Sequence, residues 1–263
     1  MPLTARLFCC LLATLCFMSL FSCATGPATP VMFKQAAEND PFEKTNRAIY
    51  GFNQAVDKAT FGPVSEIYRR RFPQPLKLSI SNFFKNLGEP TTILNDVLQG
   101  NGRQAIKDGA RFIINTSLGL FGLLDLATPL GLPYHREDYG QTLAFWGIPS
   151  GPYLVLPILG PSNARDAVGK LPALFLTDPL LLITDEPYLG AGRYGLLHAG
   201  FRTLHAIDLR AQLLVLDPLI ELQLDPYLFL RESYRQNRFN AITDNRNEPL
   251  QMPSSIEEAL FSD

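Results

Sequence analysis

The stretch from residue 146 to residue 166, WGIPSGPYLVLPILGPSNARD, combines many large apolar side chains with three glycines and four prolines. Proline lacks the amide hydrogen that a helix interior or a central strand needs, so we predict that this stretch is irregular. Its apolar side chains are not those of a solvated surface loop. The fold must therefore offer apolar surroundings to a bent backbone segment, and this requirement constrains the rest of the chain.

The first 22 residues are typical of a secretory leader. Arg6 is the only charged residue, and the apolar run of about 14 residues that follows is too short to cross a bilayer as a helix but suits a signal peptide. The tetrapeptide LFSC that ends at Cys23 resembles a bacterial lipobox, in which the cysteine is acylated after cleavage. We expect residues 1–22 to be removed and Cys23 to carry acyl chains, the alternative being an ordinary signal peptide with a chance cysteine.

The composition is apolar for an exported domain. Hydrophobic residues make up 46% of the chain, charged residues 18%, and the net charge is −2. Typical soluble domains carry about 25% charged residues, and the small net charge argues against nucleic acid as a partner. No apolar run after Cys23 approaches the roughly 18 residues of a transmembrane helix, so none is predicted.

No motif for catalysis or metal binding is present. All four cysteines lie between residues 9 and 23, so the rest of the chain can form neither a disulfide nor a cysteine metal site. The three histidines form no metal-binding motif, and a nucleophile elbow, a P-loop and a dinucleotide motif are absent. We therefore expect no enzymatic activity, no cofactor and no metal. A lipid hydrolase stays open as an alternative in which Ser162, near Asp166, would be the nucleophile.

Local signals divide the chain into four segments. Residues 1–22 are the leader, 23–39 the acylated cysteine with a tether, 40–240 a helical domain, and 241–263 a C-terminal tail. Convincing alternating strands are absent, so we predict an all-α fold of short helices interrupted by proline and glycine. After a first helix that starts at Asp40, further helices are expected at about 63–71, 75–86, 91–99, 102–118, 162–170, 188–215, 218–223 and 226–240.

The first helix has the clearest signals. Asp40 is the expected N-cap, and Pro41 suits the first helical position. One apolar stripe at helical spacing contains Phe42, Ile49, Phe52 and Val56. Asn46 and Asn53 are seven residues apart, so they lie near one another's face. A deletion near Phe52 would rotate everything beyond it by about 100° per residue.

Another segment, residues 111–132, is nearly all apolar after Arg111. A helix that is apolar on every side is buried either in protein or in lipid. Lipid contact is the simpler solution for a domain of many short helices, and packing in a protein core is the alternative.

Five ordered blocks cover nearly all of the chain after Cys23. They are DPFEKTNRAIYGFN (40–53), NFFKNLGEPTTILNDVLQG (82–100), RFIINTSLGLFGLLDLA (111–127), EDYGQTLAFWGIPSGPYLVLPILGPSNARD (137–166) and RAQLLVLDPLIELQLDPYLFLRESYRQNRF (210–239). In this combination the chain resembles the MlaA family, also called VacJ. The resemblance implies a ring of short amphipathic helices, interrupted by Pro/Gly loops and embedded in the outer membrane of a Gram-negative bacterium.

The resemblance also implies a function and partners. Members of the family remove mislocalised glycerophospholipids from the outer leaflet of the outer membrane through a central channel, and so maintain its lipid asymmetry. They associate with a trimeric porin and hand the lipid to a periplasmic carrier, MlaC, without enzymatic activity or a cofactor. The alternative is a structural outer-membrane lipoprotein that binds a protein partner and transports nothing.

On this basis we assign six residues to the channel or its gate, namely Asn46, Phe52, Asn53, Gly119, Gly122 and Asp125. The two glycines are expected hinges of a mobile loop at 118–133, because glycine relaxes the limits on φ. Asp125 would cap local backbone or face the polar lumen. The alternative is that the glycines only permit tight packing. Trp146 and Tyr153 suit a membrane–water interface.

Overall fold

In the computed structural model, the described residues are 40–175 and 193–243, so the predicted leader, Cys23 and the tether lie outside them, as does the tail beyond residue 243. The helices are α3 (Glu43–Val56), a π-helical turn (Asp57–Phe61), α4 (Gly62–Arg71), α5 (Gln74–Leu98), α6 (Gly102–Ser117), a 3-10 turn (Thr128–Leu130), α7 (Tyr139–Phe145), α8 (Ala164–Phe175), α10 (Arg193–Leu213), a second 3-10 turn (Leu214–Leu216), α11 (Asp217–Glu221) and α12 (Pro226–Ile242). The expected helical fold class is confirmed.

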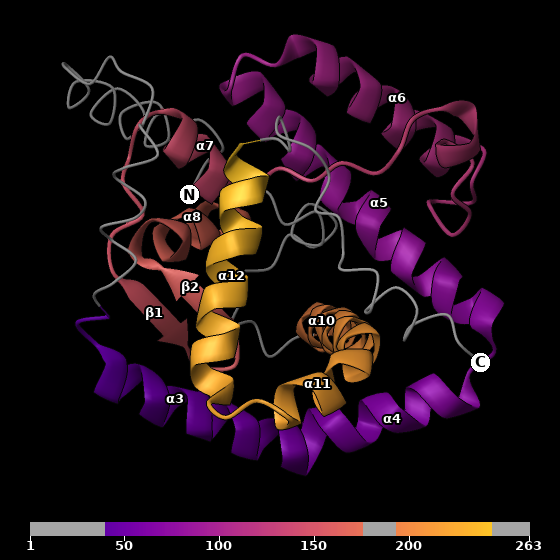
Figure 1. The fold of residues 1–263 in the computed structure, drawn as a ribbon. Helices are drawn as coiled ribbons and strands as arrows, with labels where there is room; N and C mark the ends of the chain where they lie inside the picture. The colour runs from indigo at the N-terminus through magenta and orange to yellow at the C-terminus, as the bar shows by residue number, and fades with distance from the viewer. Residues whose placement is uncertain (1–39, 176–192, 244–263) are drawn as a thin grey trace.

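Figure 1 shows the helices as a frame. α3, the π-helical turn and α4 follow one another along the lower edge, because the residues that join them keep right-handed helical backbone angles. α5 and α6 form the right and upper sides, while a β-hairpin, α7 and α8 lie on the left. α10 and α12 lie inside this frame in the view, where α10 contacts α4 and α5, and α12 contacts α7 and the hairpin.

The hairpin corrects the prediction that residues 146–166 are irregular. β1 (Tyr153–Leu156) pairs antiparallel with β2 (Gly160–Asn163), with Val155 opposite Pro161. Both strands are edge strands, so a proline can stand in a strand without removing a hydrogen bond of the ladder. The remaining prolines and the other two glycines lie outside the strands, and Gly160, the first residue of β2, adopts a φ of 75° after the turn.

Two helices differ from the sequence prediction. α5 runs without interruption through Pro90, where two separate helices were expected. A proline removes one helical hydrogen bond, but buried side chains on both sides of Pro90, such as Asn86 and Thr92, belong to the face of α5 that packs against α6. The short helix α7 was not predicted, and its N-cap is Asp138, which accepts a hydrogen bond from the Gln141 N–H at 2.9 Å.

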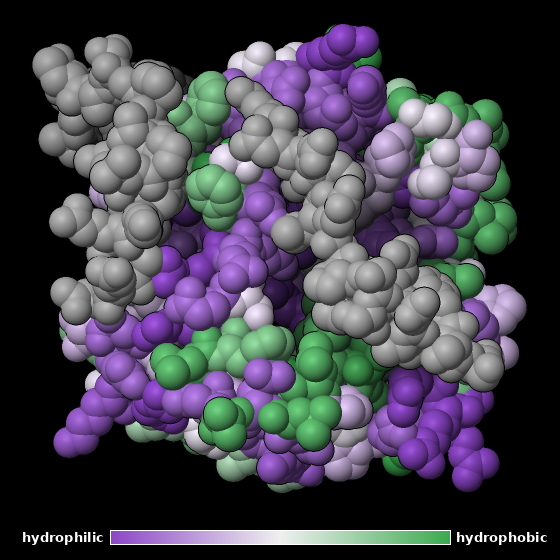
Figure 2. All heavy atoms as spheres, in the orientation of Figure 1, coloured by the Kyte–Doolittle hydropathy of each residue, from purple (hydrophilic) through white to green (hydrophobic). Residues whose placement is uncertain are grey.

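The described residues show an inverted distribution of polarity. Their largest fully buried side chains are all polar, namely Glu89, Asn46, Asn95, Thr142, Asp96, Asp108, Ser65 and Ser162. Large hydrophobic side chains are exposed on almost every helix. In Figure 2 they gather at the right-hand rim near the end of α6 and at the lower centre over α10 and α11, while hydrophilic side chains occupy the middle of the visible face. Among these residues, no helix is both long enough and apolar enough to cross a membrane.

Candidate functional site

Two asparagines of α3 hold the hairpin. The Asn46 side chain, 1% exposed, donates to the Tyr153 carbonyl oxygen at 3.0 Å and accepts from the Val155 N–H at 2.9 Å. One edge of β1 is therefore paired with amide side chains in place of a third strand. Asn53, two helical turns later, repeats the pattern, donating to the Leu156 carbonyl at 2.9 Å and accepting from the N–H of residue 158 at 2.7 Å. The predicted common face of these residues is present, and it faces the hairpin.

A buried arginine organises the space between α5, α6 and the loop after α6. Arg111, 2% exposed, binds Glu89 Oε1 at 2.9 Å and Asp125 Oδ2 at 2.8 Å, and it donates to Thr128 Oγ1 at 2.9 Å. Asp125 also accepts the Thr128 N–H at 3.1 Å, so it caps local backbone. Burial alone would raise the pKa of Asp125, but hydrogen bonds from Arg111 and Thr128 outweigh it and lower this pKa to about 2.

The loop that follows α6 packs closely against α5 and α6. Gly122 has a φ of +89°, and a Cβ there would lie 2.4 Å from the Asn86 Cβ. A Cβ on Gly119 would lie 2.3 Å from the Leu124 carbonyl oxygen. The Asn115 side-chain oxygen accepts two backbone N–H groups of the loop at 2.9 and 3.0 Å. Close packing therefore explains why both positions are glycine. The role of these glycines as hinges of a gate stays a prediction.

The tip of this loop presents apolar side chains outward. Leu120 and Phe121 have φ values of 54° and 59°, and they are 60% and 74% exposed. A left-handed backbone in residues other than glycine costs about 1–2 kcal/mol each. The fold therefore holds two large hydrophobic side chains away from the interior at an energetic cost, which is the arrangement expected of a surface that contacts lipid or an apolar partner.

Within the described residues, α12 is joined to α7 and α8 by a second arginine, whose side chain is largely shielded from solvent. Arg238 forms a bidentate pair with Asp138, at 2.7 and 2.6 Å, and it donates to Asp166 at 3.0 Å. Tyr234, one turn earlier, donates its hydroxyl to the same Asp166 at 2.5 Å. Burial opposes ionisation of Asp138, but the Arg238 guanidinium outweighs it and holds the pKa of that carboxyl below its usual value.

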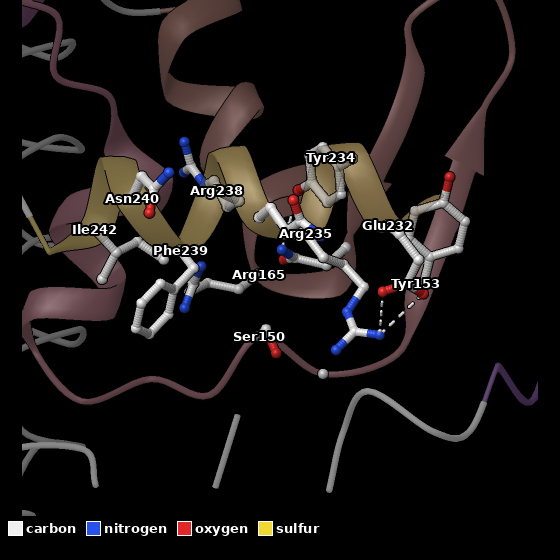
Figure 3. A pocket seen from close by; sticks show the side chains of 13 residues that line it. Ser150, Tyr153, Arg165, Glu232, Tyr234, Arg235, Arg238, Phe239, Asn240 and Ile242 are labelled. Atoms are coloured by element: carbon white, nitrogen blue, oxygen red, sulfur yellow. Dashed lines mark hydrogen bonds and ion pairs between the residues drawn. The ribbon is translucent and has the colours of Figure 1, made fainter. Parts of the chain in front are cut away.

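Beside this pair lies a pocket of about 470 Å³ between α12 and the backbone at Ser150 (Figure 3). Its walls include Arg165, Arg235 and Phe239, and Arg235 pairs with Glu232 at 3.1 Å. Arg165 is 4% exposed, and its Nη2 atom has no hydrogen-bond partner in the described part of the chain. A buried guanidinium nitrogen at a pocket wall suits an anionic ligand such as a phosphate or a carboxylate, because these groups accept charge-assisted hydrogen bonds. No sequence motif pointed to this pocket.

The other predicted site residues fall in different places. Phe52 is 52% exposed on α3, and Trp146 is 39% exposed and donates Nε1–H to the Leu98 carbonyl at 3.1 Å. Tyr153 is 7% exposed and packs in the core against Tyr227, so its assignment to a membrane interface is wrong: its strand turns this ring toward α12.

The hydrolase alternative finds no support at Ser162. This residue is fully buried, and its hydroxyl lies 3.3 Å from Lys170 Nζ and donates to the adjacent carbonyl of Asn163. The one group of described residues with the spacing of metal ligands is Asp96, His135 and Glu137, whose ligand atoms lie within 4.8 Å of one another. Because Asp96 lies on α5, far along the chain from the other two, no short motif in the sequence could have revealed the group.

Comparisons with known proteins agree with this architecture. The intermembrane phospholipid transport system lipoprotein MlaA of Escherichia coli K12 is 33% identical over 225 residues, which cover 84% of this chain and 85% of the relative. MlaA of Haemophilus influenzae is 30% identical over 241 residues, covering 90% and 91%. An uncharacterized protein of Rickettsia prowazekii is 38% identical over 149 residues, and this chain spans 59% of its length.

A solved structure, determined to explain the maintenance of bacterial outer membrane lipid asymmetry, superposes with a TM-score of 0.66 at 32% identity. The superposed region covers 78% of this chain and 100% of the solved chain. The MlaA lipoprotein family itself matches residues 38–241, a range that contains every described helix up to the last turn of α12. The chain therefore belongs to the MlaA lipoprotein family.

Proposed function

We propose that this chain is an outer-membrane lipoprotein that removes mislocalised glycerophospholipids from the outer leaflet and passes them toward the periplasm. Family membership supports the proposal. The E. coli relative is named a lipoprotein of an intermembrane phospholipid transport system, and the similar solved structure concerns outer membrane lipid asymmetry.

The inverted distribution of polarity carries the proposal. A soluble domain buries its large apolar side chains, yet the largest fully buried side chains among the described residues are polar, and leucine and phenylalanine side chains are exposed around the frame. Such a surface is stable when acyl chains surround it, while the polar interior satisfies the backbone of non-helical segments at membrane depth. A phospholipid needs both environments, because its headgroup must move through polar surroundings while its acyl chains stay in apolar ones.

The pocket beside α12 supplies a candidate contact for the headgroup. Its volume of about 470 Å³ lies within the range of roughly 300–1,000 Å³ that is usual for ligand pockets. Arg165 would bind the phosphate of the lipid. Phe239 and Ile242, which also line the pocket, would contact the apolar atoms of the lipid next to that phosphate. This division of polar and apolar walls suits the glycerol-phosphate region of a lipid.

The partners are proposed from the resemblance. A trimeric porin would pack against the apolar outer surface, and a periplasmic carrier similar to MlaC would receive the lipid at a polar face. The acyl chains on Cys23 would hold the protein at the membrane, since each buried methylene contributes about 0.8 kcal/mol to membrane binding.

The function is tested in a strain that lacks its own MlaA protein. Outer-leaflet phospholipid is measured by its accessibility to externally added phospholipase, with the chain expressed as wild type, Arg165→Gln or Arg69→Gln. We expect the wild type and Arg69→Gln to restore low accessibility, because Arg69 is exposed and, among the described residues, forms its ion pair with Glu66 on its own helix. Arg165→Gln should restore it poorly while accumulating to the same level in the membrane.

A chain that accumulates normally and leaves the lipid distribution unchanged would instead be a structural lipoprotein, the alternative function. Solubility separates the two in a second way. The Cys23→Ser variant, secreted through an ordinary signal peptide, should still require detergent, because its exposed apolar side chains remain. Full solubility of this variant without detergent would contradict an embedded frame.

A further inference from the structure

A buried group of acidic side chains lies where α5, α6 and the segment before α7 meet. Asp96 on α5 and Asp108 on α6 are each 1% exposed, and Glu137 is 4% exposed. His135 lies among them, with Nδ1 2.9 Å from Asp108 Oδ2 and 4.0 Å from Asp96 Oδ1, and with Nε2 3.4 Å from Glu137 Oε1. Three carboxylates thus surround one imidazole in the interior of the frame.

One oxygen of the Asp96 carboxylate is buried without a partner. Among the described residues, no group donates a hydrogen bond to its Oδ2 atom, and its side chain contacts the carboxylate of Asp108. The buried Arg111 on α6 is already bound to Glu89 and to Asp125. Two carboxylates that meet in a buried site require either a shared proton or a cation between them, since like charges otherwise repel strongly at low dielectric.

The surrounding amides orient the cluster as in metal centres. Glu137 Oε2 accepts from Gln99 Nε2 at 2.7 Å and from the Gln141 amide, which turns Oε1 toward His135. The contact of His135 Nδ1 with the Asp108 carboxylate fixes the ring in the same way as the carboxylate–histidine pairs that support metal ligands.

We propose that Asp96, His135 and Glu137 bind one divalent transition-metal cation, Zn²⁺ or Mn²⁺. The ligand atoms lie within 4.8 Å of one another, and bonds of about 2.1 Å to a tetrahedral ion place ligand atoms roughly 3.4 Å apart. The most distant ligand atoms need to approach one another by up to about 1.4 Å. One imidazole with two carboxylates suits these ions better than Mg²⁺ or Ca²⁺, which prefer oxygen ligands alone.

The bound cation would have a structural role in the frame. It would join the C-terminal end of α5 to the segment that leads into α7, while Asp108 links the same histidine to α6. It would also neutralise charge that the protein leaves unbalanced. This inference does not depend on lipid transport, because it concerns only how three parts of the frame are held together.

The test uses the full chain, purified in detergent without a histidine tag. After treatment with a chelator and its removal, the protein is incubated with Zn²⁺, Mn²⁺, Ca²⁺ or Mg²⁺, passed over a sizing column, and analysed for metal by mass spectrometry. We expect about one Zn²⁺ or Mn²⁺ per chain. Asp96→Asn and His135→Gln should weaken binding about tenfold or more, in line with the loss of a metal-site residue.

Matched controls come from buried residues outside the cluster. Asp208→Asn alters a carboxylate that is 3% exposed and bound by Tyr68, and His205→Gln alters a histidine that stacks on Phe84. Both should retain the metal. If the cluster variants retain as much metal as these controls, the cation binds elsewhere and the proposal is wrong.

Co²⁺ binding to the wild type gives a reading that does not depend on how a variant folds. A protein-bound Co²⁺ ion with a nitrogen ligand has visible absorption bands that differ from those of the hydrated ion. An unchanged spectrum of the hydrated ion, together with no retained Zn²⁺ or Mn²⁺, would overturn the proposal and assign a shared proton to Asp96 and Asp108. Retention of Ca²⁺ or Mg²⁺ alone would overturn the assigned class of ion.

Discussion

Replacing Asn46 by alanine should release the hairpin from α3. The Asn46 side chain makes hydrogen bonds to Asp40 Oδ1, to the Tyr153 carbonyl and from the Val155 N–H, at 2.9, 3.0 and 2.9 Å. Tyr153 and Val155 are 7% and 4% exposed, so water cannot easily replace the lost amide. Two buried polar groups left without partners cost about 1–3 kcal/mol each, which predicts a loss of roughly 2–6 kcal/mol.

Asn53→Ala is the matched control for this prediction. Asn53 makes the same pair of hydrogen bonds, but residue 158, whose N–H it accepts, is 65% exposed. Water can replace the lost amide as a hydrogen-bond partner there, so the expected loss in the free energy of unfolding is about 1 kcal/mol. The two substitutions remove the same atoms from the same helix and break the same pair of bonds to the hairpin, but Asn46→Ala leaves buried groups behind and also loses the bond to Asp40.

Both variants are measured by thermal unfolding in detergent, followed by circular dichroism and by the fluorescence of Trp146, the only tryptophan. For a domain of this size, 1 kcal/mol shifts the Tm by about 2–4 °C. We expect Asn46→Ala to lower the Tm by roughly 5–20 °C and Asn53→Ala by about 2–4 °C. Equal shifts for the two variants, or a shift below about 2 °C for Asn46→Ala, would refute the claim that buried amide pairing holds the hairpin.

Three further predictions concern backbone and charge. The pKa of Asp125 is lowered from 3.8 to about 2, so the contribution of this carboxylate to stability is present above pH 4 and lost as the pH falls toward 2. Asp125→Asn should lower the free energy of unfolding by about 1–2 kcal/mol at pH 7. The free energies of unfolding of the variant and the wild type should converge at pH 2. Gly122→Ala should destabilise the protein far more than Gly131→Ala in urea denaturation, because both have a positive φ but only the first Cβ meets another atom, at 2.4 Å. Deletion of Phe52 should abolish lipid removal while the protein still accumulates normally in the membrane. Deletion of Ala59 should be tolerated, because the π-helical turn that contains it can lose one residue and become α-helical. Equal lipid phenotypes of the two deletions would contradict this prediction.

The sequence predicts local structure well where a short pattern fixes it. The seven-residue separation of Asn46 and Asn53 correctly predicts that both side chains lie on one face of the first helix, because helical geometry alone determines which residues share a face. Their partner could not be predicted, since β1 lies more than a hundred residues away along the chain. The helix itself begins at Glu43 and not at the proline, although Asp40 still accepts the N–H of residue 42 at 3.2 Å.

The failures come from tertiary contacts that override local rules. Pro90 predicts a break that packing against α6 prevents, and the prolines around Tyr153 predict an irregular segment that folds as two edge strands. The same hairpin buries Tyr153, whose amphipathic ring alone suggests an interface. His135 and its acidic neighbours meet only because three separate elements converge, so neither the spacing nor the composition could indicate their proximity.

Several arginines of the described residues each bind two carboxylates and so join parts of the fold. Four of them connect elements that are distant in sequence or separated by a turn, namely Arg47, Arg111, Arg210 and Arg238. Arg47 links α3 to the start of α12, and Arg111 links α6 to α5 and to the loop after α6. Arg210 links α10 to the π-helical turn and to α11, and Arg238 links α12 to α7 and α8. A planar guanidinium donates in fixed directions, so each pair of carboxylates defines one relative position of the joined elements. A chain that leaves its leucines on the outside cannot rely on an apolar core for a unique structure, and these forked pairs supply the missing specificity while keeping the interior polar, as the proposed transport of a phospholipid requires.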